Sequence, residues 1–214
     1  MKRRNWLGVA AVLALAVGAI VPRGAGALTL ADLDAGGSFS AGSLTFDDFD
    51  VVLAGDLPVD LTAYAVQVLA DGFRISGPLS AILGGSGTLL ISYEVSALSP
   101  IISGASLLAP GATVGAGAQA LVVESLLGPA SEVLGSLFVF DVEGGGADPD
   151  DAAGFTPVSS VSVVKSVIVG GGLLAAMPMV EQRFFALGEP LTVILLVGGL
   201  AGLAIAGRRR DMPV

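Results

Sequence analysis

Short runs in which apolar and polar residues alternate fill the middle of this chain of 214 residues. Residues 88–95 show the pattern most clearly, because every second residue from Leu89 to Val95 is large and apolar. Successive side chains of a strand point to opposite faces, so such a run predicts a β-strand with one buried face. A chain made of many such runs must bury their apolar faces against one another, as when one sheet packs on another.

The same pattern predicts further strands between turn residues. The break in alternation at Asp47 and Asp48 predicts a β-bulge, and the Asp-Gly pair at 71–72 predicts a hairpin. Residues 116–127 are rich in helix formers and allow a short helix instead of a strand, whereas the composition of residues 144–151 predicts a loop. The expected strands are residues 43–53, 62–69, 73–76, 88–95, 101–108, 112–125, 133–142, 158–169 and 177–185.

Roughly seven to nine short strands, with turn residues about every 8–12 positions, indicate an all-β fold. We expect an antiparallel β-sandwich, with a β-barrel or jelly roll as the alternative. The folded segment should end near the glycines at 170–172 or just after Phe185.

The first 27 residues have the composition of a secretory signal peptide. A basic start at residues 2–4 precedes an uncharged, mainly apolar run at 6–20, and small residues at Ala25 and Ala27 form a cleavage site. We therefore expect export through the secretion machinery, cleavage by signal peptidase before Leu28, and a mature segment that begins there.

The end of the chain holds a second apolar run. Residues 191–207 contain no charged side chain and would span about 25 Å as a helix, enough to cross a bilayer with little tilt. Arg208, Arg209 and Arg210 follow and act as a membrane stop, because clustered arginines favour the cytoplasmic side. This orientation places the residues before Glu189 on the outer side of the membrane.

An acidic-Pro dipeptide, an apolar helix and an arginine cluster in this order resemble the PEP-CTERM sorting signal of Gram-negative bacteria. Glu189 and Pro190 match the core of the motif, and Gly188 stands where the family usually has a proline. The resemblance covers residues 188–214 and implies processing by a membrane-embedded sorting protease, an exosortase. The alternative is an ordinary single-pass anchor, which would hold residues 28–187 at the membrane as an ectodomain.

Charge is distributed very unevenly in residues 28–187. Seventeen carboxylates stand against three cations, Arg74, Lys165 and Arg183, which leaves a net charge of −14. Such a surface repels phosphate backbones, so we expect no nucleic-acid partner. The two arginines are expected at the surface or paired with a carboxylate.

The chain contains neither cysteine nor histidine, which excludes most zinc, copper, haem and iron-sulfur ligation. Oxygen ligands can still bind Ca²⁺, and closely spaced aspartates on turns are the candidate residues. Solvated turns at the edge of a sheet explain the same pattern. The candidate ligands are Asp47, Asp48, Asp50, Asp148, Asp150 and Asp151.

The sequence argues against an enzyme. Serine hydrolases need a base beside the nucleophile, usually histidine, and Ser162 and Lys165 would point to opposite faces of a strand. Glycosidases need two suitably spaced carboxylates and usually line their cleft with aromatic side chains, which are few here. We therefore expect a secreted or surface-displayed structural or adhesive protein. Extracellular polysaccharide is its expected partner, and a permanently anchored ectodomain that binds Ca²⁺ or carbohydrate is the alternative.

Overall fold

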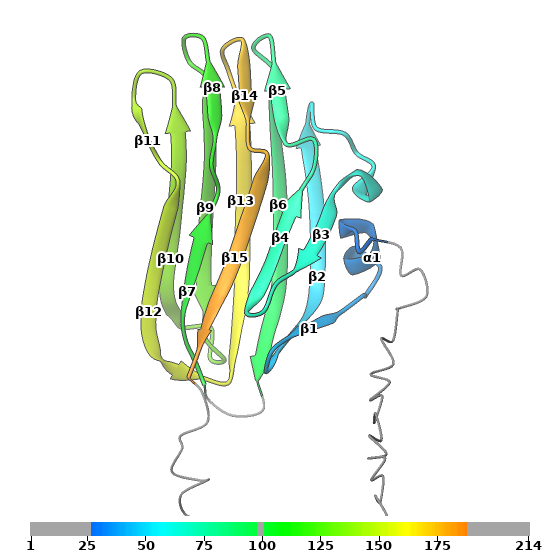
Figure 1. Cartoon of the computed structure of the whole chain (residues 1–214), viewed down its shortest axis with the longest axis vertical. Coiled ribbons are helices and arrows are strands. Elements are labelled where there is room, and N and C mark those ends of the chain that lie inside the picture. Colours follow the sequence, from blue (N-terminus) through cyan, green and yellow to red (C-terminus); the bar gives the residue numbers. More distant parts are fainter. Residues whose placement is uncertain (1–26, 98–100, 188–214) are drawn as a thin grey trace, which may run out of the picture.

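A computed structural model describes residues 27–97 and 101–187 of the chain. Two antiparallel sheets lie face to face and enclose the core, which makes the described segment a β-sandwich (Figure 1). The predicted cleavage residue Ala25 and the whole predicted tail, including Glu189 and Arg208, lie outside the described residues. Within the described residues, no helix has both the length and the apolar character needed to cross a bilayer.

One sheet has seven strands in the order β1-β2-β6-β13-β9-β10-β11, and every neighbouring pair in it is antiparallel. Its long central strands pair along most of their length, so their registers are tightly defined. The strands are β1 (Phe39–Ala41), β2 (Leu44–Gly55), β6 (Ser86–Ala97), β13 (Ser160–Gly170), β9 (Gln119–Leu127), β10 (Val133–Val142) and β11 (Gly146–Asp148).

The second sheet has five strands in the order β12-β7-β15-β4-β3, again all antiparallel. These are β12 (Asp150–Val158), β7 (Ile102–Leu108), β15 (Met179–Ala186), β4 (Gly72–Ser76) and β3 (Ala65–Val68). Three short strands form a small third sheet, β5 (Ser80–Ile82), β14 (Leu174–Ala176) and β8 (Ala112–Val114). Gly171 and Gly172, both with positive φ, form the turn from β13 into β14.

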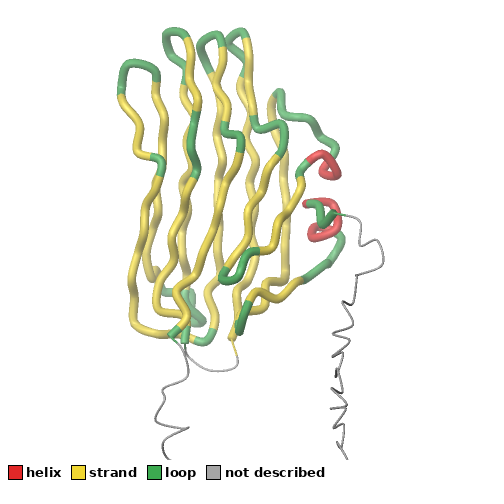
Figure 2. The backbone as a smooth tube through the Cα atoms, in the orientation of Figure 1, coloured by secondary structure: helices red, strands yellow, loops and turns green. Residues whose placement is uncertain are grey.

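Two short helices, α1 (Leu30–Asp34) and the 3-10 helix Leu61–Ala63, lie together at one side of the sandwich (Figure 2). Helix α1 contacts β2, and its residues Leu30 and Leu33 are fully buried. The Asp34 carboxylate accepts a hydrogen bond of 2.9 Å from the backbone N–H of Val51. That N–H lies just past the bulge in β2, so the helix supplies a partner to a backbone group near the irregularity.

A cluster of aromatic rings fills the core between the sheets. Phe46 stacks on Phe39 with ring centres 4.8 Å apart, and it meets Phe73 and Phe184 edge to face. Tyr93 stacks on Phe49 at 5.1 Å in the same cluster. Offset and edge-to-face pairs of this kind add stability beyond the area they bury. The core therefore joins the two sheets through β2 and β6 on one side and β4 and β15 on the other.

Several sequence predictions are confirmed. The alternating residues 88–95 lie within β6 with the expected face buried, and the predicted bulge in β2 falls between Asp47 and Asp50. Strands β3 and β4 form the predicted hairpin, and β10 has the predicted bounds of 133–142. The antiparallel all-β architecture was therefore readable from periodicity and turn residues.

Of the two alternatives for residues 116–127, the strand holds. Residues 119–127 form strand β9, because they pair with strands on both sides and that pairing overrides helix propensity. Other predictions are wrong. The expected strand 112–125 is two strands, β8 and β9, separated by a turn. The expected loop at 144–151 holds β11 and the start of β12. Strand β12 itself was missed, because its many small residues leave no strong alternation.

Replacing Phe46 with alanine should destabilise the fold by about 3–5 kcal/mol, because it removes a fully buried ring that contacts both sheets. Urea unfolding of a fragment spanning residues 28–187, which contains every residue of the described core, measures the change. Val59→Ala is the control, because Val59 is 82% exposed and its loss should change stability by only about 0.5 kcal/mol. Equal effects of the two substitutions would contradict the described packing.

Candidate functional site

The outer face of the five-stranded sheet carries a row of polar side chains in register. Opposing residues of neighbouring strands lie side by side, so one row crosses all five strands. From β12 to β3 the row reads Asp150, Leu108, Glu181, Arg74 and Gln67. Opposite charges therefore meet at the centre of the face.

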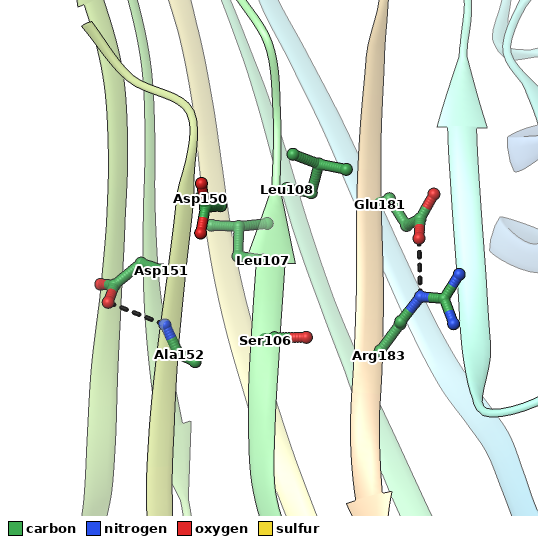
Figure 3. Close-up of a pocket in the computed structure, with 8 residues that line it drawn as sticks. All are labelled: Ser106, Leu107, Leu108, Asp150, Asp151, Ala152, Glu181 and Arg183. Atoms are coloured by element: carbon green, nitrogen blue, oxygen red, sulfur yellow. Dashed lines mark hydrogen bonds and ion pairs between the residues drawn. The ribbon is translucent and has the colours of Figure 1, made fainter.

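The small residues Ala152 and Ser106 lie next to this row and leave a shallow trough. Ala152, Ser106 and Arg183 oppose one another in the next row, and a depression of about 320 Å³ lies between the taller side chains (Figure 3). Its lining includes Leu108, Asp150 and Glu181. We call this depression the β7 trough.

A third row, Gly154, Gly104 and Phe185, lies beside the β7 trough. A side chain at Gly104 would collide with the Phe185 ring at 2.7 Å, so the glycine makes room for the ring over β7. Phe185 is 45% exposed, so the ring offers an apolar platform on this face.

Glu181 orders the two arginines on this face. Arg74 donates to its Oε2 at 2.6 Å and Arg183 Nε donates to its Oε1 at 2.7 Å. Arg183 also pairs with Asp71 at 3.2 Å, and Figure 3 shows Glu181 and Arg183 joined on β15. The two arginines were expected at the surface or paired with a carboxylate, and each is both partly exposed and paired.

The ion pairs set the protonation of Glu181. Burial alone would raise the pKa of this carboxyl, but the hydrogen bonds and charges of Arg183 and Arg74 outweigh burial and lower it. The hydrogen bond to Glu181 and the negative charges of Asp71 and Glu181 raise the pKa of Arg183. Glu181 and Arg183 are therefore both charged at neutral pH and are held in one arrangement.

A buried polar cluster lies behind the β7 trough, between the sheets. Lys165 Nζ donates to Gln182 Oε1 at 2.6 Å and forms an ion pair of 3.0 Å with Glu124 Oε2. The ammonium also lies 5.9 Å from the centre of the Phe73 ring. Glu124 and Lys165 oppose each other on β9 and β13, and Gln182 comes from β15 in the other sheet.

Burial governs the protonation of this cluster. Loss of water raises the pKa of Glu124 and lowers that of Lys165, and the attraction between the two groups only partly offsets each shift. Burial, together with the charge of Glu124, also raises the pKa of Tyr93. The Tyr93 hydroxyl, both Glu124 oxygens and the Gln182 nitrogen lack a partner with hydrogen-bond geometry. The ion pair therefore satisfies charge better than it satisfies hydrogen bonding.

The aspartates predicted as Ca²⁺ ligands are not brought together as a group. Among the described residues, no three acidic side chains gather as a metal site. Asp47, Asp48 and Asp50 lie along β2, at its bulge. On the other side, Asp148 ends β11 and Asp150 faces the β7 trough. The remaining candidate, Asp151, accepts a hydrogen bond from the backbone of Phe138.

Sequence reasoning missed Glu124 and Gln182, the two buried partners of Lys165. Ser162 is exposed and Lys165 buried, as the alternation of the strand predicts, yet the buried partner of the lysine was not identified. Glu124 falls on the apolar face of its own alternating run, and that position is the signal that could have paired it with Lys165. Gln182 gave no such signal, because its partner comes from a distant strand.

No family model and no curated protein matches the sequence. Among solved structures, a complex of TmCBM61 with β-1,4-galactotriose aligns at 12% identity and a TM-score of 0.35, over 64% of this chain and 88% of that one. The Gap123 glycosylation-associated complex from Streptococcus agalactiae aligns at 12% identity and 0.28, over 65% and 49%. A structure of carbohydrate-binding modules of the β-sandwich superfamily aligns at 9% and 0.29, over 70% and 58%. Likenesses this distant support no functional conclusion about this chain.

Removing one member of the buried pair should destabilise the protein strongly. Lys165→Met leaves Glu124 buried without its counter-charge and should cost about 3–5 kcal/mol. Adding Glu124→Leu should recover most of that loss, because no buried charge is then left unpaired. Urea unfolding of the four members of this double-mutant cycle measures the coupling.

The free energy of unfolding of these variants should also depend on pH in a characteristic way. The raised pKa of Glu124 predicts that stability falls as pH rises from the ordinary value of 4.5 through the higher folded value. The lowered pKa of Lys165 predicts that stability falls as pH drops from 10.5 through its lower folded value. The double variant should lose both slopes. Additive losses with unchanged pH slopes would contradict the ion pair.

Proposed function

We propose that this chain is a secreted, non-enzymatic surface protein that binds a neutral extracellular polysaccharide in the β7 trough. The observation that carries the proposal is Glu181, held between Arg74 and Arg183 on an open face beside small residues. Fixed donors and acceptors next to apolar patches are what a site for hydroxyl-bearing ligands needs.

The chemistry of the β7 trough suits sugar hydroxyls. Arg183 is 44% exposed at its side chain and Asp150 is exposed, so one offers N–H donors and the other accepts. Leu108 and the Phe185 ring provide apolar surface for the C–H faces of a sugar ring. The net charge of −14 over residues 28–187 disfavours an acidic polymer, so the ligand should be neutral.

Binding fits the geometry better than hydrolysis does. A glycosidase needs a general acid with a raised pKa beside a second carboxylate. The pKa of Glu181 is lowered, and arginines engage both of its oxygens. Asp151 accepts from the backbone N–H groups of Phe138 and Ala152. Asp150 is therefore the one carboxylate in the trough lining with no described hydrogen-bond partner. Glycoside hydrolysis needs two available carboxyl groups.

The two ends of the chain support delivery to the cell surface. The basic start, apolar run and Ala25/Ala27 site of residues 1–27 suit export and cleavage by signal peptidase. The tail of residues 188–214, with Glu189 and Pro190, suits recognition by an exosortase in the inner membrane and release to the surface. The competing proposal is a permanent anchor that keeps the same sandwich at the membrane.

Filling the β7 trough should abolish retention by a neutral polysaccharide. Native gels cast with soluble neutral glucans, galactans or mannans measure binding as slowed migration of the protein. Ser106→Leu should lower affinity at least tenfold, and Arg183→Gln about ten- to a hundredfold through a lost charged hydrogen bond. Ser40→Leu, exposed on edge strand β1 of the opposite sheet and outside the trough lining, is the matched control and should bind like wild type. If no polysaccharide slows the wild-type protein, the proposal fails.

Mass spectrometry of the protein recovered from its producing cells should show two new ends. Signal cleavage places the first residue at Leu28, and sorting removes the chain from near Glu189 onward. Exchanging Glu189 and Pro190 for alanine should leave the tail attached and the protein in the membrane fraction. Wild-type protein that always retains residues 191–214 would favour the permanent anchor.

A further inference from the structure

The outer face of the seven-stranded sheet, opposite the β7 trough, carries apolar side chains in register. The row through its middle reads Val52, Leu90, Ser166, Val123 and Phe138 on β2, β6, β13, β9 and β10. The flanking row on one side reads Ala54, Thr88, Ile168, Leu121 and Phe140, and on the other Asp50, Ser92, Val164, Ser125 and Ser136. We call these three rows on five strands the neutral face.

Large apolar groups are exposed on the neutral face. Val52, Leu90, Val123, Phe138 and Val164 are each between 39% and 49% exposed. The Phe138 and Phe140 rings stack with centres 5.4 Å apart, which makes one apolar plate at the β10 side. Single exposed apolar residues are ordinary, but a contiguous patch marks an interaction surface.

Charge is nearly absent from the neutral face although residues 28–187 are strongly acidic. Asp50 is the one charged residue in its three rows, and it lies at the β2 edge. The next carboxylates outward are Asp47, Asp48 and Glu94 beyond one end and Asp148 on β11 beyond the β10 side. All three cations of the segment are engaged elsewhere, in ion pairs. A basic partner would find almost no carboxylate to pair with on this face. An uncharged, apolar surface would match it.

We propose that the neutral face binds a second copy of this chain, face to face. Five strands about 4.8 Å apart and six residues long at about 3.4 Å each, the extent of the three rows, cover roughly 490 Å². Two copies would therefore bury about 1,000 Å², the size of a small, reversible interface. Sheets stacked this way pack about 10 Å apart with nearly aligned strands.

A twofold axis along the strands also keeps the carboxylates apart. Such an axis places the β2 edge of one copy over the β10 side of the other. Asp50, Asp47 and Glu94 then face the neutral residues Ser136, Val133 and Leu127 instead of their own equivalents. Both copies are acidic, so the dimer should become tighter as salt screens the repulsion between them.

Single cysteines test the proposal in the full-length exported protein, because the native chain has no cysteine. Ser166 lies on the middle strand of the middle row, near the proposed axis, so a short bismaleimide reagent should join two copies of Ser166→Cys into a covalent dimer across the gap between the sheets. Ser106→Cys is the matched control, since Ser106 is a half-buried serine on the outer face of the other sheet. Val123→Cys, on the neighbouring strand β9, tests the case in which the twofold axis is displaced by one strand. The readout is the dimer band on denaturing gels.

The expected result is a dimer band for Ser166→Cys or Val123→Cys that exceeds the band for Ser106→Cys at least fivefold and increases with salt. Adding Phe138→Asp, which places a charge on the apolar plate, should reduce that band at least fivefold. Equal or absent bands for all three variants overturn the proposal. Protection of the thiol of Ser166→Cys from a maleimide reagent without cross-linking overturns it too, because a different partner then covers the neutral face.

Discussion

The buried ammonium of Lys165 is the contact on which the arrangement of the two sheets depends. It reaches across the core from β13 to Gln182 on β15 while it pairs with Glu124 on β9. Removing two charges from water is costly, and this cost is recovered only when the partners lie in one particular geometry. Sliding β15 by one residue would take the Gln182 amide away from the ammonium. The cluster therefore selects a register that apolar packing alone would specify less sharply.

That register also arranges the outer surface. Side chains alternate along β15, so Gln182 facing inward requires Glu181 and Arg183 to face outward. Glu181 then meets Arg74 on β4 and lies beside Leu108 on β7, which creates the polar row of the β7 trough. With no cysteine in the chain, no disulfide can fix the sheets relative to each other. The contact of Gln182 with Lys165 inside the core and the contact of Glu181 with Arg74 on the outer face both follow from the register of β15.

Periodicity predicted which residues lie inward, and it could not predict which strands become neighbours. The alternation of residues 88–95 and the break at Asp47 are local signals, and both match the structure. The pairing of Lys165 with Glu124 and Gln182 depends on strand order, which brings distant segments together and leaves no trace in local composition. Strand β12 was not predicted for another reason: its small residues fit a sheet without forming a strongly apolar face. The β7 trough was missed with it, because Asp150 and Ala152 line that site.

The two outer faces have opposite characters, and together they suit the proposed role in adhesion. The five-stranded face holds both surface arginines, whereas the neutral face holds no cation and one edge carboxylate. Two copies joined through their neutral faces would present their β7 troughs on opposite sides of the dimer. Each trough could then hold a different polymer chain, so that weak single-site binding becomes a cross-link whose strength grows with the number of engaged sites. A monomer with the same trough would coat a polymer without joining two, so self-association is the property that would turn the proposed polysaccharide binder into an adhesive protein.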